Sequence, residues 1–180
     1  MFIIQSLWYI LPAGLANMMP VFVRKYFKFL EIPVDFGKKF KNKSIFGSHK
    51  TWRGVIFGII GSMFLILIQA LLYFNFEIFR KISLIKFENI NFILLGFLLG
   101  FGALFGDLVK SFFKRQINVK PGAKFFPWDQ IDFILGALLF SSIVFRPKWY
   151  IYIFLILIIP FFHIFFNHFG YWIGIQKTKW

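Results

Sequence analysis

The chain has 180 residues, of which 59% are hydrophobic and 23% aromatic, and it carries a formal net charge of +14. Water-soluble domains are usually closer to half apolar, and the excess here falls in long runs, so the composition excludes an ordinary soluble domain and indicates an integral membrane protein. There is no cysteine, which excludes disulfides and thiolate metal sites.

The positive charge lies in short loops between apolar runs. In a soluble protein this charge would suggest a nucleic-acid partner. Next to membrane spans, the cations fit anionic lipid headgroups or a polyphosphate substrate better. We therefore expect the membrane as a partner, and no nucleic acid.

Five segments are long and apolar enough, or nearly so, to cross the roughly 30 Å hydrocarbon core of a bilayer as helices. In chain order the predicted spans are 2–23, 55–76, 89–106, 130–145 and 149–170. The N-terminus lacks the basic residues of a signal peptide, which favours a first span over a cleaved leader. The prediction is an all-α polytopic membrane protein, with residues 1–180 forming one domain.

The loops predict the orientation of these spans. Loops 24–53 and 109–129, with Lys177 and Lys179 in the tail, hold sixteen of the 21 basic residues. The two loops on the other side hold five. By the positive-inside rule the first set faces the cytoplasm, so the N-terminus lies outside and the C-terminus inside. We expect a multi-pass protein of the cell membrane with its polar site facing the cytoplasm.

Small residues recur at helix-packing spacing in the second and third spans. They are Gly54, Gly58 and Gly61 in the second span, and the GxxxG pairs Gly96 with Gly100 and Gly102 with Gly106 in the third. Such faces let helix backbones approach closely, so packing is their expected role.

The first cytoplasmic loop contains the stretch GSHKTWRG. Its Lys50, Thr51 and Arg53 offer an ammonium, a hydroxyl and a guanidinium, all of which bind phosphate. The pattern is not a P-loop, because GxxxxGK[ST] is absent. Two simpler interpretations stay open: the cations serve only the positive-inside signal, and Trp52 is an interfacial anchor.

Three of the seven acidic residues lie in a stretch that joins the third and fourth spans. Asp107 ends the third span, and Asp129 and Asp132 share a helical face at i and i+3. A salt bridge to Lys110 or Lys114 is one interpretation of Asp107, and a helix N-cap is one of Asp129. The N-cap does not explain Asp132. Carboxylates that converge among cations favour Mg²⁺ bound together with polyphosphate, the usual arrangement for chemistry at phosphorus.

The two halves of this stretch also form a recognisable pattern. GDLVKSFFKR (106–115) followed by WDQID (128–132) resembles the C-terminal signature of the CTP-dependent cytidylyltransferases that make CDP-activated lipids. The matching residues are Ser111, Lys114, Arg115, Asp129 and Asp132. Bacterial CDP-diacylglycerol synthases carry His-Gly-Gly before the box and Arg within it, where this chain has KPGAKFFPWDQID with Gln130. This departure points to the shorter archaeal-type branch, the CDP-archaeol synthases.

Further blocks along the chain are similar to the same branch. They are LPAGLANMMPV (11–21), IPVDFGK (32–38), IFGSHKTWRGVIFG (45–58), and the closing stretch with Asn167 and GYWIGIQKTKW (170–180). The resemblance covers essentially the full length. It implies that CTP and a lipid phosphate, 2,3-bis-O-geranylgeranylglycerol 1-phosphate, give a CDP-lipid and pyrophosphate with Mg²⁺ required.

The resemblance also implies roles for individual residues. Mg²⁺ would be held by the carboxylates of Asp107, Asp129 and Asp132. The phosphates would be screened by Lys50, Arg53, Lys114, Arg115 and Lys120, of which Lys114 is also counted as catalytic, and their oxygens would be oriented by Ser111 and Thr51. Asn17 would contact a headgroup or pack, and Asp35 belongs to a family block as a substrate-binding residue. A role for K⁺ and the oligomeric state stay open.

Other functions fit parts of the pattern. An anion transporter would place ionisable residues through several spans, but here they cluster at one face. A scaffold would not require carboxylates and phosphate-binding groups to converge. A CDP-alcohol phosphotransferase would show a dense D-x-x-D-G-x₂-A-R pattern, which is absent. CDP-diacylglycerol formation from phosphatidic acid stays an alternative, because the sequence does not distinguish ether-linked from ester-linked lipid.

Overall fold

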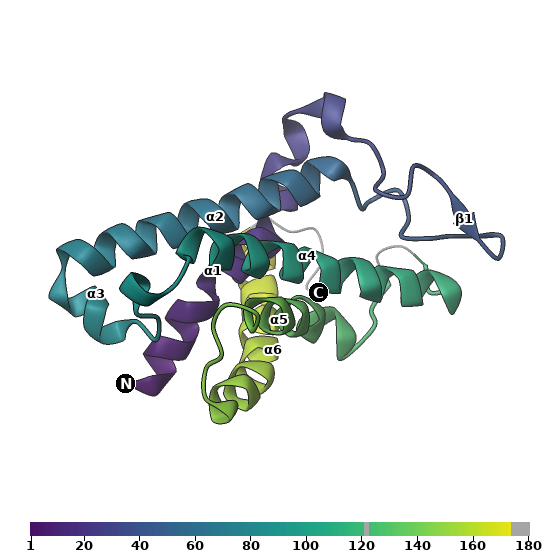
Figure 1. Ribbon diagram of the computed structural model, residues 1–180. Coiled ribbons are helices and arrows are strands. Elements are labelled where there is room, and N and C mark those ends of the chain that lie inside the picture. The colour runs from purple at the N-terminus through teal and green to yellow at the C-terminus, as the bar shows by residue number, and fades with distance from the viewer. Residues whose placement is uncertain (121–122, 174–180) are drawn as a thin grey trace.

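The computed structural model describes residues 1–120 and 123–173 and is mostly helical (Figure 1), which confirms the predicted class. Its elements in chain order are α1 (Phe2–Phe22), 3₁₀ turns at Val23–Lys25 and Lys28–Leu30, a hairpin of β1 (Lys39–Phe40) and β2 (Lys43–Ser44), α2 (Trp52–Asn75), α3 (Glu77–Ile82), a 3₁₀ turn at Phe87–Asn89, α4 (Phe92–Gln116), α5 (Trp128–Ser141) and α6 (Trp149–Trp172). Lys177, Lys179 and most of the closing family block lie outside the described residues, as does the side chain of Asn167.

Among the described residues, three helices are long and apolar enough to cross a membrane: α1 with its following turn, α2 and α4. A shorter apolar helix runs from Trp149 to Phe162 in α6. The 14 residues of α5 span about 21 Å, which is less than the roughly 30 Å hydrocarbon core. The number of about five spans, and their orientation, therefore stay predictions.

Capping residues explain where α2 and α4 begin. The Oγ1 atom of Thr51 accepts a hydrogen bond from the N–H of Gly54 at 3.3 Å, so α2 begins three residues before the predicted span. The Asn91 side chain caps α4 in the same way. The third span was predicted to end at Asp107, and the helix itself continues past this residue, because α4 ends at Gln116. Asp107 therefore lies inside a helix, away from the unfavourable end of its dipole.

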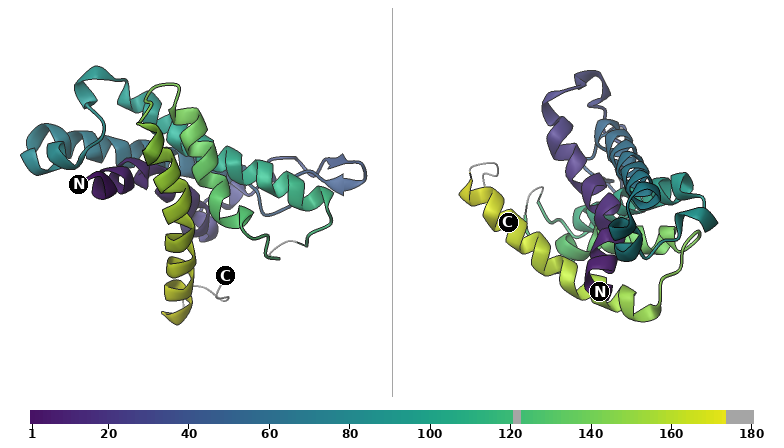
Figure 2. Two further views of the ribbon diagram at one scale, coloured as in Figure 1. Left: turned by 90° about the horizontal axis from the view of Figure 1, so that it is seen from below. Right: turned by 90° about the vertical axis from the view of Figure 1, so that its left-hand side faces the viewer.

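α4 packs against α1, α2 and α5, and it is the centre of the bundle (Figure 1). The hairpin projects at one end of the bundle, and α3 lies at the other. The hairpin is fastened to the end of α4, where Phe40 and Phe112 lie 5.8 Å apart between ring centroids and the Lys43 ammonium donates to the carbonyl of Gln116. Figure 2 shows α6 leaving the bundle at a steep angle.

A glutamine in α2 supplies the hydrogen bond that a proline in α1 cannot make. Pro12 has no N–H to donate to the carbonyl of Trp8, so that oxygen would be unsatisfied inside the bundle. The fully buried Gln69 side chain donates to this oxygen at 2.7 Å. The pairing joins α1 to α2 and explains a polar residue in an apolar span.

The glycines of α4 confirm the predicted helix-packing faces, and they pack against two different helices. Gly96 and Gly100 face α2, where a Cβ on either would overlap the side chain of Ile66 or Ser62. In turn, the glycines of α2 face α1: Gly54 lies beside Pro20, Gly58 beside Ala16, and Gly61 beside Met19.

Gly102 and Gly106 face α5, and here backbone meets backbone. A Cβ on Gly102 would come closer than 3.0 Å to the carbonyl oxygen of Gly136, and one on Gly106 would come equally close to the carbonyl oxygen of Asp132. This approach is open only to residues without a Cβ. It sets Asp132 on α5 beside Asp107 on α4.

Replacing Gly106 with alanine tests this contact. We expect Gly106→Ala to lower the midpoint of thermal unfolding in detergent, because overpacking costs about 1–3 kcal/mol even where flexible side chains can shift, and here the obstacle is backbone. The control is Gly14→Ala in α1, where an added Cβ meets nothing within 4 Å. Equal unfolding midpoints for the two variants would contradict the close approach of α4 and α5.

Candidate active site

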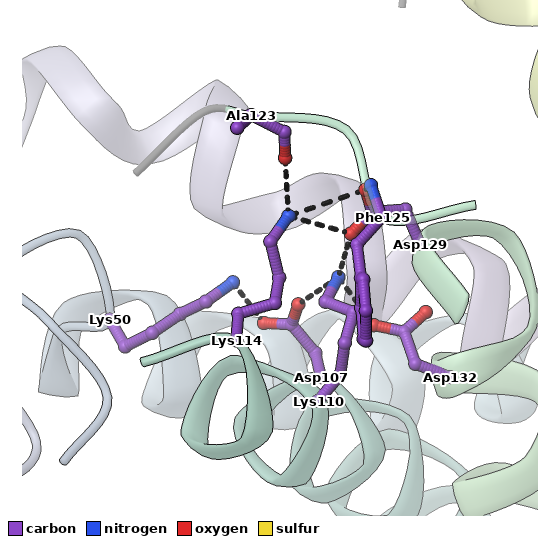
Figure 3. Close-up of polar contacts among 8 residues, drawn as sticks. All are labelled: Lys50, Asp107, Lys110, Lys114, Ala123, Phe125, Asp129 and Asp132. Carbon is purple, nitrogen blue, oxygen red and sulfur yellow. Dashed lines mark hydrogen bonds and ion pairs between the residues drawn. The ribbon is translucent and has the colours of Figure 1, made fainter. Parts of the chain in front are cut away.

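Three aspartates from α4 and α5 converge on one ammonium group, that of Lys110 (Figure 3). The Nζ atom of Lys110 lies 3.1 Å from Oδ1 of Asp107, one helical turn earlier on α4. It lies 3.3 Å from Oδ1 of Asp129 and 2.7 Å from Oδ2 of Asp132, both in α5. The predicted shared face of Asp129 and Asp132 is confirmed, and so is the salt bridge between Asp107 and Lys110.

Two further lysines flank this group. Lys50, from the loop before α2, pairs with Oδ2 of Asp107. Lys114, one turn after Lys110 on α4, lies 3.1 and 3.3 Å from the two carboxylate oxygens of Asp129. Three lysines thus balance three aspartates, and the cluster has no net formal charge. This balance is what allows charged groups to be buried here.

Asp129 also organises the loop that precedes α5. Its Oδ2 atom accepts a hydrogen bond from the N–H of Phe125 at 2.7 Å, and Lys114 donates to the carbonyl of Ala123 at 2.6 Å. The interpretation of Asp129 as an N-cap was wrong, because Pro127 occupies that position and Asp129 lies in the first turn.

A basic cavity of ≈ 330 Å³ opens beside the cluster. Its polar lining comes from His49 and Lys50 in the first loop and from Lys110, Ser111, Lys114 and Arg115 on α4. Four of these side chains are permanent cations and one is a hydroxyl, which is a lining suited to a polyanion.

A second, smaller cavity of ≈ 50 Å³ shares two lining residues with the first. Lys50 and His49 line both cavities, whereas Asp107 and Thr51 line only the smaller one. The remaining lining of the smaller cavity is largely apolar, with Leu104 among its residues. Lys50 therefore lines both the larger, basic cavity and the smaller, partly apolar one.

Asp35 shapes the wall of the larger cavity from outside it. Its buried carboxylate accepts hydrogen bonds from the N–H groups of Gly37 and Phe46 at 2.9 Å and of Gly47 at 3.3 Å. Burial raises the pKa of Asp35, but the three backbone donors outweigh burial and hold that pKa below its usual value. Phe46 and Gly47 line the cavity, so Asp35 fixes backbone there and does not itself face the cavity.

Five other predicted residues line neither cavity: Asp129 and Asp132 of the cluster, and Arg53, Asn17 and Lys120. The Arg53 guanidinium is buried against the carbonyl of Tyr26 at 3.0 Å and the carboxylate of Glu31 at 3.2 Å, so it ties the first loop to α2. Asn17 is half-buried on α1, and Lys120 is exposed in the loop after α4.

From the sequence, Lys110 was expected only as a salt-bridge partner, and no role was predicted for Gly47 or His49. The spacing of Lys110 from Asp107 signals one ion pair, but it does not reveal the two partners on another helix. Gly47 has a φ of +92°, which favours glycine, and this backbone lies against the Arg115 side chain. A sequence does not show such a contact.

Comparisons with known proteins agree with one another over the full length. The family model described as CarS-like, CDP-archaeol synthase, matches residues 1–180. Curated proteins named CDP-archaeol synthase are similar to this chain: the one from Thermococcus onnurineus is 41% identical, covering 99% of this chain and 97% of its own, and the one from Methanocaldococcus jannaschii is 36% identical, covering 97% and 96%. The one from Archaeoglobus fulgidus is 33% identical, covering 99% and 98%.

A solved structure has the same fold. It is described as "Structural insight into an intramembrane enzyme for archaeal membrane lipids biosynthesis", and it superposes with a TM-score of 0.72 at 24% identity, covering 90% of this chain and 92% of its own.

The role of Asp35 predicts a local effect of its substitution. In Asp35→Asn an NH₂ group replaces one of the acceptor oxygens, so at least one of the three backbone N–H groups loses its partner. We expect faster amide hydrogen exchange at Gly37 or at Phe46 and Gly47, measured by mass spectrometry. Glu31→Gln, in the same loop, is the control and should leave these amides unchanged. Unchanged exchange in Asp35→Asn would contradict the assignment.

Proposed function

This chain belongs to the CDP-archaeol synthase family, and from that premise we propose how its carboxylate–lysine cluster carries out the reaction. The protein is a membrane enzyme that forms CDP-archaeol. The observation that carries the proposal is the convergence of Asp107, Asp129 and Asp132 on one cation beside a basic cavity.

The proposed reaction joins a lipid phosphate to the CMP part of CTP. An oxygen of the lipid phosphate attacks the α-phosphorus of CTP, the bond from that phosphorus to the β-phosphate bridging oxygen breaks, and pyrophosphate leaves with the electron pair. The lipid phosphate is already largely dianionic at neutral pH, because the second pKa of a phosphomonoester is about 6. No general base is needed, and the main obstacle is the approach of two anions.

The cluster suits Mg²⁺ by the chemistry of its donors. Mg²⁺ prefers oxygen ligands and is usually bound by one or two carboxylates together with substrate phosphates. The three carboxylates already surround a cation, the Lys110 ammonium, so the electrostatic potential that they create favours positive charge at this point. When bound there, Mg²⁺ would neutralise the negative charge that develops on the phosphates.

The larger cavity is the proposed site of the triphosphate. Lys50, Lys114 and Arg115 would donate charge-assisted hydrogen bonds to its oxygens, and the Ser111 hydroxyl, 4% exposed, would orient one of them. These groups lie on α4 and on the loop before α2, and α4 also carries Asp107, which lines the smaller cavity.

The smaller cavity is the proposed site of the lipid phosphate. Its lining combines Lys50 and the Thr51 hydroxyl with apolar side chains such as Val55 and Leu108. An anionic headgroup and the start of its hydrocarbon chains would find matching surroundings there. Lys50 would then contact both phosphates and offset their mutual repulsion.

We propose that this site faces the cytoplasm. The strongly basic loop 24–51 and the C-terminal part of α4, with Lys110, Lys114 and Arg115, lie at the end of the bundle that carries the cluster, whereas α3 lies at the opposite end (Figure 1). By the positive-inside rule the end with the basic loops is cytoplasmic, which is also where CTP is available.

The test is an assay of CDP-lipid formation in detergent with labelled CTP, Mg²⁺ and the bis-geranylgeranylglycerol phosphate. We expect Asp132→Asn to lower the rate on the order of 100-fold or more, because it removes one of the carboxylates that would hold the metal. Glu77→Gln, an exposed acid on α3, is the matched control and should keep the wild-type rate. Chelation by EDTA should abolish the wild-type rate, and added Mg²⁺ should restore it.

Two outcomes of this assay would contradict parts of the proposal. A folded Asp132→Asn variant with the wild-type rate would remove the metal assignment. Faster turnover of phosphatidic acid than of the ether-linked phosphate would favour the CDP-diacylglycerol alternative.

A further inference from the structure

Lys110 forms an ion pair with each of the three aspartates. An ammonium group has three N–H donors, and the Nζ atom of Lys110 has one carboxylate oxygen from each aspartate within 3.3 Å. Its side chain is 14% exposed. Among the described ion pairs Asp107 and Asp129 each have a second lysine, but that of Asp132 is with Lys110 alone. Lys110 is therefore the cation that joins the three acids.

A metal ion and the Lys110 ammonium cannot occupy this place together. Mg²⁺ binds oxygen at about 2.0–2.1 Å. An ion that close to oxygens of all three aspartates would take the volume that Nζ now fills, since Nζ lies 2.7–3.3 Å from the same oxygens. Two cations in contact inside a largely buried site repel strongly. Lys110 must leave if the metal is to enter.

Charge balance decides when this exchange is favourable. The three aspartates are already neutralised by Lys50, Lys110 and Lys114, so a divalent ion alone would bring uncompensated positive charge into a buried site. A triphosphate in the adjacent cavity brings negative charge that compensates for it. The metal is thus expected to bind well only together with the nucleotide.

The displaced Lys110 ammonium can move into the larger cavity. Lys110 lines the larger cavity, beside Ser111 and Arg115. Its flexible four-carbon stem allows the ammonium to rotate from the carboxylates into that cavity. There it would meet phosphate oxygens in place of carboxylate oxygens.

We propose that Lys110 is a tethered cation that holds the carboxylate site in the metal-free enzyme and yields it to a divalent cation when the triphosphate binds. The inference rests on the proposed function, because it requires both metal and nucleotide to bind at this site. By linkage, metal and nucleotide each raise the affinity for the other by the same factor. Lys110 would thereby prevent metal from occupying the site unproductively.

The experiment measures binding of Mn²⁺, as a probe for the metal, by electron paramagnetic resonance without nucleotide. Lys110→Met removes the ammonium while keeping a side chain of similar length. We expect this variant to bind Mn²⁺ roughly tenfold or more tightly than the wild type, since a competing like charge is gone. Lys39→Met removes the same charge from the exposed hairpin, so it should bind Mn²⁺ as the wild type does.

Thermal unfolding gives a second readout that needs no activity. In EDTA, Lys110→Met leaves three carboxylates with two lysines, so its unfolding midpoint should fall below that of the wild type. Mn²⁺ should raise the midpoint of the variant more than that of the wild type. If Lys110→Met does not fold in EDTA, Lys110→Gln, which keeps a neutral donor, replaces it in both measurements.

Two outcomes would contradict the exchange, and they differ in whether the metal site itself is retained. Equal Mn²⁺ affinity in the wild type and Lys110→Met, with binding lost in Asp132→Asn, would overturn the exchange but leave the metal site in place. Failure of both proteins to bind Mn²⁺, with CTP as well as without it, would overturn the exchange and the metal assignment of the proposed function together.

Discussion

The approach of the α4 and α5 backbones is the constraint on which the active site depends. Two helices come this close only where neither has a Cβ at the contact, and here the contact is made by Gly102, Gly106 and Gly136. Because Gly106 lies against the backbone of Asp132, the carboxylate of Asp132 lies beside that of Asp107. A wider helix separation would remove Asp132 from the reach of a cation on α4, so packing and chemistry are coupled at this point.

Once the helices are this close, electrostatics determines the rest of the site. Buried carboxylates need compensation, and the chain supplies it from three places: Lys110 and Lys114 on α4, and Lys50 from the loop before α2. These contacts also fix the surrounding loops, since Lys114 holds the loop before α5 and Asp35 holds the wall of the larger cavity. The charges that would act on substrate are therefore the same ones that fix the loops at this end of the bundle.

Much of this could be predicted from the sequence, because membrane spans, glycine spacing and the i, i+3 aspartates are local patterns. The helical class, the packing faces and the convergence of Asp129 and Asp132 all follow from such patterns. The apolar run ends at Asp107, but it does not show how far the helix continues, which is to Gln116. Arg53 resembles a phosphate ligand in sequence, but its contacts to Tyr26 and Glu31 come from a loop fold that no periodicity encodes. The contacts of Lys110 with Asp129 and Asp132 depend on how α4 packs against α5, which the sequence does not show.

The central claim is that three aspartates form a cation site shared in turn by Lys110 and a metal ion, next to the triphosphate. An experimental structure with CTP and Mg²⁺ tests it most directly. We expect the ion to be held by Asp107, Asp129 and Asp132, directly or through water, and the Lys110 ammonium to lie at a phosphate oxygen. An ion bound away from these aspartates, or a Lys110 ammonium still among them beside bound CTP, would contradict it.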